Sequence, residues 1–92
     1  MITHFADSDT ENFFHGQRVA KFAHVERVAM KKLQMLNAAT DLRYLRSPPA
    51  NRLEALKGER CGQYSIRIND QYRLCFCWQN GHATHVEIVD YH

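Results

Sequence analysis

The chain has 92 residues, of which 45% are hydrophobic and 24% charged, and its formal net charge is +2. This length predicts one domain, residues 1–92, with a modest hydrophobic core, and the composition excludes a disordered or fibrous protein. No apolar run approaches the roughly 20 residues that cross a membrane. The acidic start lacks the basic segment and long apolar stretch of a signal peptide, so we expect a cytoplasmic protein that does not bind membranes.

The first half of the chain is predicted to be mainly helical. The segment "MITHF" favours a short strand at residues 1–5, and Asp7 or Asp9 is suited to cap a helical turn after it. Residues 22–36 carry apolar side chains every three or four positions, which is the pattern of an amphipathic helix. Asp41 can start one more turn before the paired prolines of "RSPPAN" end regular structure.

The second half of the chain has the period of a β-sheet. Residues 52–62 are polar, contain two glycines and are interpreted as a loop. Apolar and polar side chains then alternate in "QYSIRI", "YRLCFCW" and "THVEIVDYH", and Asn80-Gly81 is a strong hairpin signal. The pattern predicts an antiparallel three-strand meander with one covered face, and therefore an α+β fold with the helices packed on that face.

Positive charge is concentrated in the middle of the chain. Residues 43–73 contain seven arginines and lysines against three acidic residues, whereas the remainder has a net charge of −2. Arg67 and Arg73 flank a turn of the meander, on the face opposite the apolar side chains. Like charges on neighbouring strands repel each other, and guanidinium groups bind phosphate through parallel hydrogen bonds. The pair is interpreted either as an anion site or as two solvated side chains.

The loop before the meander adds two cations beside glycines. Lys57 and Arg60 lie in "LKGERCG", where Gly58 and Gly62 allow the backbone to approach a ligand closely. The glycine spacing is not that of a P-loop or of a dinucleotide-binding motif. The segment is therefore either a second part of an anion site or an ordinary polar loop.

The chain ends with an acid, a phenol and an imidazole: Asp90, Tyr91 and His92. Histidine has a reference pKa of about 6.5, which suits proton transfer near neutral pH, and a nearby carboxylate can orient an imidazolium. In a regular strand Asp90 and His92 would share the face of Ile88, and Tyr91 would point the other way. These residues are either a solvated end or a site, and a site requires the backbone to leave strand geometry after Val89.

No metal or cofactor site is indicated. The histidines are scattered without the spacing of metal ligands, and no second cysteine pair exists to complete a zinc site. Cys75 and Cys77 lie two positions apart in a predicted strand, where they act as small apolar residues. Together with Cys61, they are interpreted as inert thiols of a reducing cytoplasm.

Two stretches are especially distinctive: "LKGERCGQYSIRINDQYR" and the terminal "VDYH". With "MLNAATDLRYLRSPPAN", they resemble the HigB toxins, a branch of the RelE-like toxin superfamily. The resemblance implies two N-terminal helices on a curved antiparallel sheet with a short N-terminal strand and the C-terminal meander. It also implies a ribosome-dependent, metal-independent endoribonuclease that cuts mRNA in the ribosomal A site. Such toxins are neutralised by a helix-turn-helix antitoxin of the HigA type, and only the complex acts on operator DNA.

The resemblance assigns the chain end and two cations to the functional site. Asp90, Tyr91 and His92 correspond to the functional C-terminus of these toxins. Lys57 and Arg73 correspond to their phosphate-contacting positions. His92 is then expected to exchange a proton during RNA cleavage, oriented by Asp90.

Three further residues are expected near this site. Arg60 and Arg67 are added by proximity only. Glu54 stands where some HigB-like toxins have a histidine. Its carboxylate could accept a proton but would also repel phosphate, which makes His92 the more important candidate.

A non-enzymatic interpretation is also open. A small basic protein could bind RNA or a partner through the same arginine-bearing face and regulate without cleaving. Discrete cuts in mRNA would support the enzyme, whereas inhibition of translation with intact mRNA would support binding alone.

Overall fold

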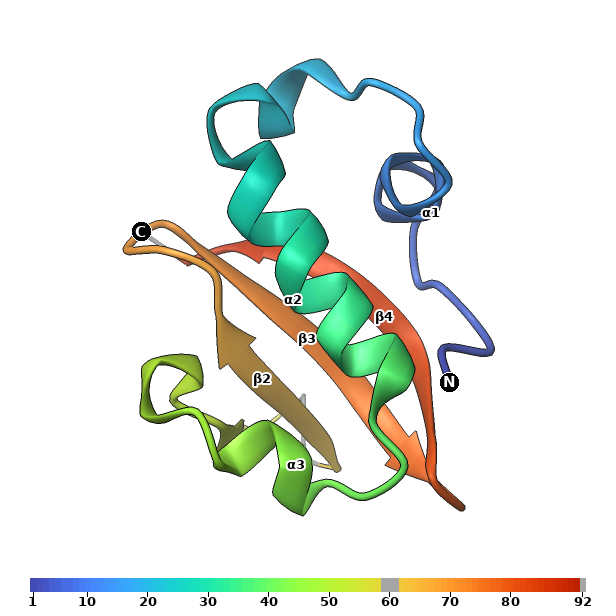
Figure 1. The fold of residues 1–92 in the computed structure, drawn as a ribbon, viewed down its shortest axis with the longest axis vertical. Coiled ribbons are helices and arrows are strands. Elements are labelled where there is room, and N and C mark those ends of the chain that lie inside the picture. Colours follow the sequence, from blue (N-terminus) through green and yellow to red (C-terminus); the bar gives the residue numbers. More distant parts are fainter. Residues whose placement is uncertain (59–61, 92) are drawn as a thin grey trace.

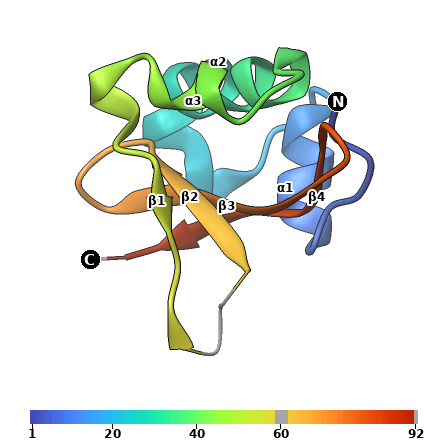
Figure 2. The same cartoon turned by 90° about the horizontal axis from the view of Figure 1, so that it is seen from below.

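The computed structural model describes residues 1–58 and 62–91, with helices in the first half and strands in the second. The helical elements are α1 (Ser8–Phe14), the 3₁₀ helix η1 (Ala20–Val25), α2 (Glu26–Ala38), α3 (Arg43–Arg46) and the 3₁₀ helix η2 (Pro49–Asn51). The strands are β1 (Glu54–Ala55), β2 (Gln63–Arg67), β3 (Tyr72–Gln79) and β4 (His82–Asp90). Helices cover one face of a four-stranded antiparallel sheet (Figure 1, Figure 2), which confirms the predicted α+β fold.

The helices begin largely where local signals place them. Asp7 caps α1 by accepting a hydrogen bond from the backbone N–H of Thr10 over 3.3 Å. The predicted amphipathic helix starts as η1 and becomes α2 only at Glu26, because Val25, the last residue of η1 and the N-cap of α2, has a non-helical backbone with φ −127° and ψ 12°. Asp41 accepts the backbone N–H of Arg43 over 2.9 Å, which confirms the predicted extra turn. Both parts of the amphipathic segment bury apolar side chains in the core, although Val28, which is part of the apolar pattern, is exposed.

The sheet contains the predicted meander and one additional strand. The order is β1-β2-β3-β4, each strand antiparallel to its neighbour. Asn80-Gly81 joins β3 to β4, as predicted, with both residues at positive φ. The interpretation of residues 52–62 as a loop was wrong for Glu54–Ala55, which pairs with β2 as β1. Two residues are too few to display a period of two, so the pattern could not indicate this strand.

The N-terminal segment lies along the outer edge of β4 without forming a regular strand. It makes isolated parallel bridges from Ile2 to Ala83 and from Phe5 to Val86. Between these points β4 is irregular: His85 has φ 53°, and the β3–β4 register shifts. An irregularity of this kind interrupts a hydrogen-bonded ladder. The predicted short strand is therefore reduced to two bridges, which still cover the sheet edge.

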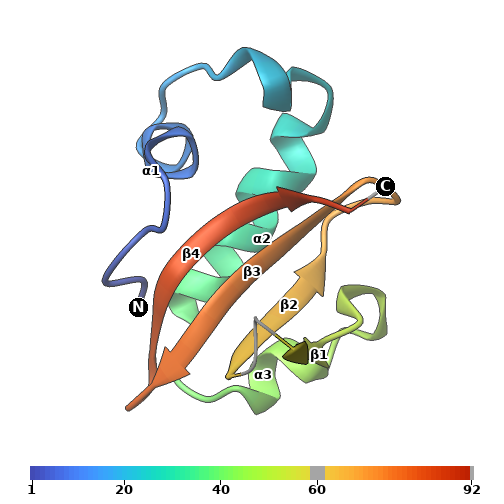
Figure 3. The same cartoon turned by 180° about the vertical axis from the view of Figure 1, so that it is seen from behind.

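Alternation along the strands separates a covered face from an open face. The covered face carries the hydrophobic core, in which the sheet contributes Ile66, Leu74, Phe76 and Val86, all fully buried. The other face, turned toward the viewer in Figure 3, has no helix packed on it. We call it the open face, and the strand register places its residues in two rows: Glu54, Ser65, Cys75 and Glu87, and then Arg67, Arg73 and Val89.

Replacing Gly81 with alanine is expected to destabilise the protein by about 1–3 kcal/mol. Gly81 has φ 80°, and an added Cβ would lie 3.3 Å from the backbone oxygen of Thr40. Urea unfolding should therefore show a lower midpoint with an unchanged slope. Gly16 provides the control, because its φ is also positive but an added Cβ would meet no atom within 4 Å. Equal losses for Gly81→Ala and Gly16→Ala would contradict a contribution from the Thr40 contact.

Candidate functional site

Among the described cations of the open face, Arg73 is held by the most hydrogen bonds. Its Nε donates to the hydroxyl oxygen of Ser65 over 2.8 Å. Its Nη2 donates to the carbonyl oxygens of Arg52 over 2.6 Å and of Ser65 over 3.3 Å. Hydrogen bonds from a charged donor are about twice as strong as neutral ones. The guanidinium is therefore held in one orientation on the sheet.

The carbonyl of Arg52 reaches Arg73 because of an unusual backbone conformation. Arg52 adopts left-handed geometry, with φ 47° and ψ 56°, directly after η2. The preceding residue, Asn51, is fully buried. Its side chain donates to the carbonyl oxygen of Leu45 over 3.0 Å and accepts a hydrogen bond from Nζ of Lys32 in α2. The helix layer thus fixes the turn that presents the Arg52 carbonyl.

Arg67 lies directly opposite Arg73 in the β2–β3 ladder, as the turn predicted. The two side chains nevertheless have different partners. Arg67 forms an ion pair with Asp70 in the turn between β2 and β3. Asp70 offsets the charge of Arg67, so Arg73 is the stronger candidate for binding an anion.

Glu54 lies on the open face in β1, and Lys57 follows two residues after the end of that strand. Glu54 is exposed, and its register partner Ser65 places it on the same face as Arg73. Lys57 is exposed just beyond β1. Arg60, which was predicted to lie beside Lys57, is outside the described residues. The register therefore places the Glu54 carboxylate on the same sheet face as Arg67 and Arg73.

The chain end is attached to the turn between β2 and β3 (Figure 1). β4 continues to Asp90, so the backbone leaves strand geometry one residue later than predicted. Asp90 accepts a hydrogen bond from Nε2 of Gln71 over 3.1 Å, and the Tyr91 N–H donates to the Gln71 carbonyl over 2.5 Å. The Tyr91 hydroxyl lies 3.8 Å from Sγ of Cys75, which brings the phenol onto the open face. His92 is outside the described residues.

Sequence reasoning missed Ser65, the Asn51–Arg52 turn and Gln71. Ser65 stands at a polar position of an alternating strand and was expected to face solvent, but it is fully buried. One signal was available: the predicted register puts Ser65 diagonally across from Arg73, within reach of a long side chain. No local pattern predicts the left-handed Arg52, because arginine has no preference for that conformation.

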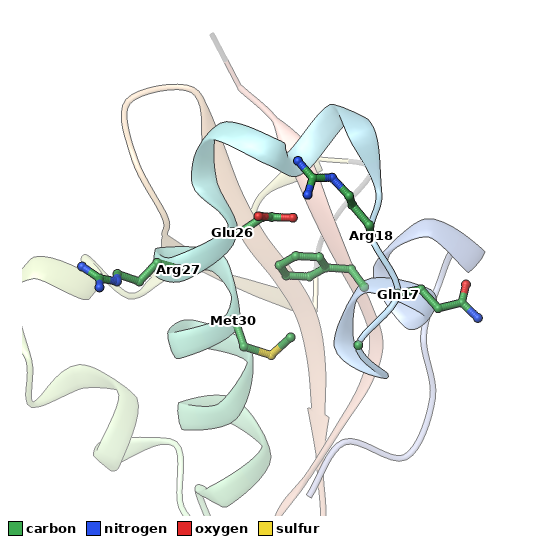
Figure 4. Close-up of a pocket in the computed structure, with 7 residues that line it drawn as sticks. Gln17, Arg18, Glu26, Arg27 and Met30 are labelled. Carbon is green, nitrogen blue, oxygen red and sulfur yellow. The ribbon is translucent and has the colours of Figure 1, made fainter.

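A pocket of about 330 Å³ lies in the helix layer, remote from the open face (Figure 4). Phe13 of α1 and Met30 of α2 form its apolar part. Arg18, Glu26 and Arg27 also contribute to its lining. Because α1, the loop after it and α2 supply the whole lining, this pocket is separate from the Arg73 site.

The described ranges, 1–58 and 62–91, contain neither a metal-binding cluster nor a membrane-spanning helix. No three His, Cys, Asp or Glu side chains gather there in a way that could hold a metal ion. No helix there is long and apolar enough to cross a membrane. Cys75 is buried and Cys77 is half-buried, whereas Cys61 is outside these ranges.

Because of Lys32, the free energy of unfolding is expected to depend on pH in the alkaline range below 10.5. Its side chain is buried, and burial lowers its pKa below the ordinary 10.5. Between the lowered pKa and 10.5 the unfolded chain binds more protons than the folded one, so the free energy of unfolding rises with pH. Urea unfolding at several pH values below 10.5 should show this rise relative to Lys32→Met. Parallel curves for the two proteins would contradict it.

Comparison with solved structures defines the class of fold. A chain of the heterotetrameric YoeB–YefM toxin–antitoxin complex of Staphylococcus aureus superposes with a TM-score of 0.59 at 23% identity, covering 100% of this chain and 98% of that one. At this identity the likeness shows the fold alone, which this chain shares with a chain of that complex.

Comparison of sequences gives the family. The profile described as "RelE-like toxin of type II toxin-antitoxin system HigB" matches residues 3–92. Toxin HigB-1 of Vibrio cholerae serotype O1 is 39% identical over 85 residues, covering 90% of each chain. An uncharacterised protein of Haemophilus influenzae is 36% identical over 85 residues, covering 90% of this chain and 84% of that protein. The chain belongs to the HigB-like toxins, a RelE-like family of type II toxin–antitoxin systems.

Proposed function

We propose that this toxin is a ribosome-dependent, metal-independent endoribonuclease that cleaves mRNA in the ribosomal A site and thereby inhibits translation. The observation that carries the proposal is the arrangement of Arg73 and Tyr91. A guanidinium held by three hydrogen bonds and a phenol approach the same open, solvent-accessible sheet face. A cation and an aromatic ring on an open sheet suit an RNA phosphate and its base.

The cleavage step proceeds by attack of the ribose 2′-hydroxyl oxygen on the adjacent phosphorus. The new O–P bond forms as the bond to the 5′-oxygen breaks, so the products are a 2′,3′-cyclic phosphate and a 5′-hydroxyl. One group must accept the 2′-hydroxyl proton, cations must stabilise the charge on the phosphoryl oxygens, and a donor must protonate the leaving oxygen.

The candidate site residues are assigned to these roles by their chemistry. Arg73 and Lys57 stabilise the phosphate, and His92 exchanges a proton. Asp90 orients His92. The hydrogen bond that Asp90 accepts from Gln71 supports this role, because it restrains the carboxylate. Tyr91 positions the nucleotide by stacking.

Three residues have secondary roles in this proposal. Arg60 and Arg67 add positive charge around the RNA backbone, with Arg67 weakened by its ion pair to Asp70. Glu54 is a second candidate for accepting a proton, because it is exposed on the same face.

The partners follow from membership of a type II system. We propose that a helix-turn-helix antitoxin of the HigA type neutralises residues 1–92, which act as one toxin domain. The complex, and not the toxin alone, contacts operator DNA. The toxin acts in the cytoplasm, where it meets ribosomes that carry mRNA in the A site.

Primer extension on mRNA from cells that express the toxin tests this function. Discrete cuts at fixed positions within codons are expected soon after induction. Inhibition of translation with intact mRNA would reject cleavage and leave the alternative, a basic protein that binds RNA or a partner without cutting. Cells that express Arg73→Ala serve as the control for cuts made by other ribonucleases.

A further inference from the structure

Among the described residues, the hydrogen bonds of Arg73 involve the Nε and Nη2 edge of its guanidinium. They do not involve Nη1. Nε and Nη2 form the edge that faces β2, and both donate to protein acceptors. Within the described part of the chain, Nη1 donates to none. A guanidinium has five N–H donors in a fixed plane, so fixing one edge also sets the direction of the remaining two N–H groups.

The two residues that supply these acceptors, Ser65 and Arg52, are held rigidly. Ser65 is fully buried in β2 and pairs with β1 on one side and with β3 on the other. Arg52 has a left-handed backbone, a conformation that persists only where the surroundings impose it and that often marks a functional position. Its neighbour Asn51 supplies this constraint, because it is buried and bonded to both Leu45 and Lys32.

We propose that Ser65 is a positioning residue for cleavage: its hydroxyl, with the carbonyl of Arg52, locks Arg73 so that Nη1 points at the phosphate being cleaved. The proposal rests on the proposed function, since it gives Arg73 a phosphate to stabilise. A preorganised donor lowers the barrier more than a free one, because it does not have to reorient as the charge develops. An arginine without this lock would still attract RNA but would stabilise the reacting phosphate less.

The activity test is a double-mutant cycle on programmed ribosomes. Ser65→Ala should reduce the single-turnover cleavage rate by about 10- to 100-fold, as misplaced catalytic groups do, with little change in KM. In an Arg73→Ala background the same change should have no further effect, because its effect acts through Arg73. A loss of equal size in both backgrounds, or an unchanged rate in Ser65→Ala alone, would overturn the proposal. Ser8→Ala, at an exposed position in α1, is the matched control.

A second measurement tests, without an activity assay, whether the Ser65 hydroxyl restrains the Arg73 guanidinium. In ¹⁵N-labelled protein, the Nε–H of Arg73 should exchange slowly with solvent, and Ser65→Ala should accelerate its exchange while backbone amides of β2 and β3 remain protected. Exchange that is equally fast in both proteins would overturn the positioning role. If the exchange changes as expected but the unaltered toxin cuts no mRNA, the lock stands and the proposed function fails.

Discussion

Replacing His92 with glutamine is expected to abolish growth inhibition and to lower the rate of mRNA cleavage by about 10²–10⁴-fold. Glutamine keeps a polar side chain of similar length but cannot exchange a proton near neutral pH, whereas histidine can. Growth after induction and cleavage on programmed ribosomes measure the two effects. The fold and antitoxin binding should not change, because His92 follows the last strand of the sheet.

His82→Gln is the matched control for this change. His82 is exposed and begins β4, at the opposite end of the strand from Asp90. It should retain full toxicity. Full toxicity in His92→Gln as well would remove His92 from the mechanism and leave Glu54 as the candidate for proton transfer.

Replacing Arg73 with alanine is expected to lower the cleavage rate by about 10²–10³-fold, which is the usual cost of losing one donor to a developing oxyanion. Arg73→Lys should recover only part of the rate, because an ammonium has no planar fork and cannot bond Ser65 and Arg52 in the same way. Arg73→Ala also leaves the buried Ser65 hydroxyl without its donor, at a cost of about 1–3 kcal/mol of stability. Urea unfolding must therefore accompany the rate measurement.

Two other arginines calibrate the result. Arg67→Ala removes the cation directly opposite Arg73 on the open face, but that cation is paired with Asp70, so the loss of rate should be smaller. Arg27→Ala changes an exposed cation at the helix-layer pocket and should leave the rate unchanged. Equal losses for Arg67→Ala and Arg73→Ala would show that only the total charge of the face matters, which contradicts a specific role for Arg73.

Elements with a long periodic pattern were predictable from the sequence. The three meander strands and the amphipathic helix each repeat a signal several times, and Asn80-Gly81 is a specific hairpin motif. The two-residue β1 repeats nothing, and its pairing with β2 depends on contacts distant in sequence. The change from η1 to α2 at Glu26 was missed for a similar reason, because apolar spacing is nearly the same in a 3₁₀ and an α-helix.

The candidate site was predictable as a set of side chains but not as a geometry. Strand parity placed Arg67 opposite Arg73, and the register confirms this. Strand parity could not show that Asp70 pairs with Arg67 while Ser65 holds Arg73. Those differences depend on which rotamer reaches which acceptor. The contribution of Arg52 could not be predicted from the sequence, because its backbone carbonyl, and not its side chain, accepts the hydrogen bond from Arg73.

Cleavage of a defined mRNA on purified ribosomes, with both new ends analysed chemically, tests the central claim most directly. With the toxin added, we predict one cut within the codon in the A site, a 2′,3′-cyclic phosphate on the upstream fragment and a 5′-hydroxyl on the downstream one. The same mRNA without ribosomes should remain intact. A 3′-hydroxyl with a 5′-phosphate, cutting of free mRNA, or arrested translation on uncut mRNA would contradict the account.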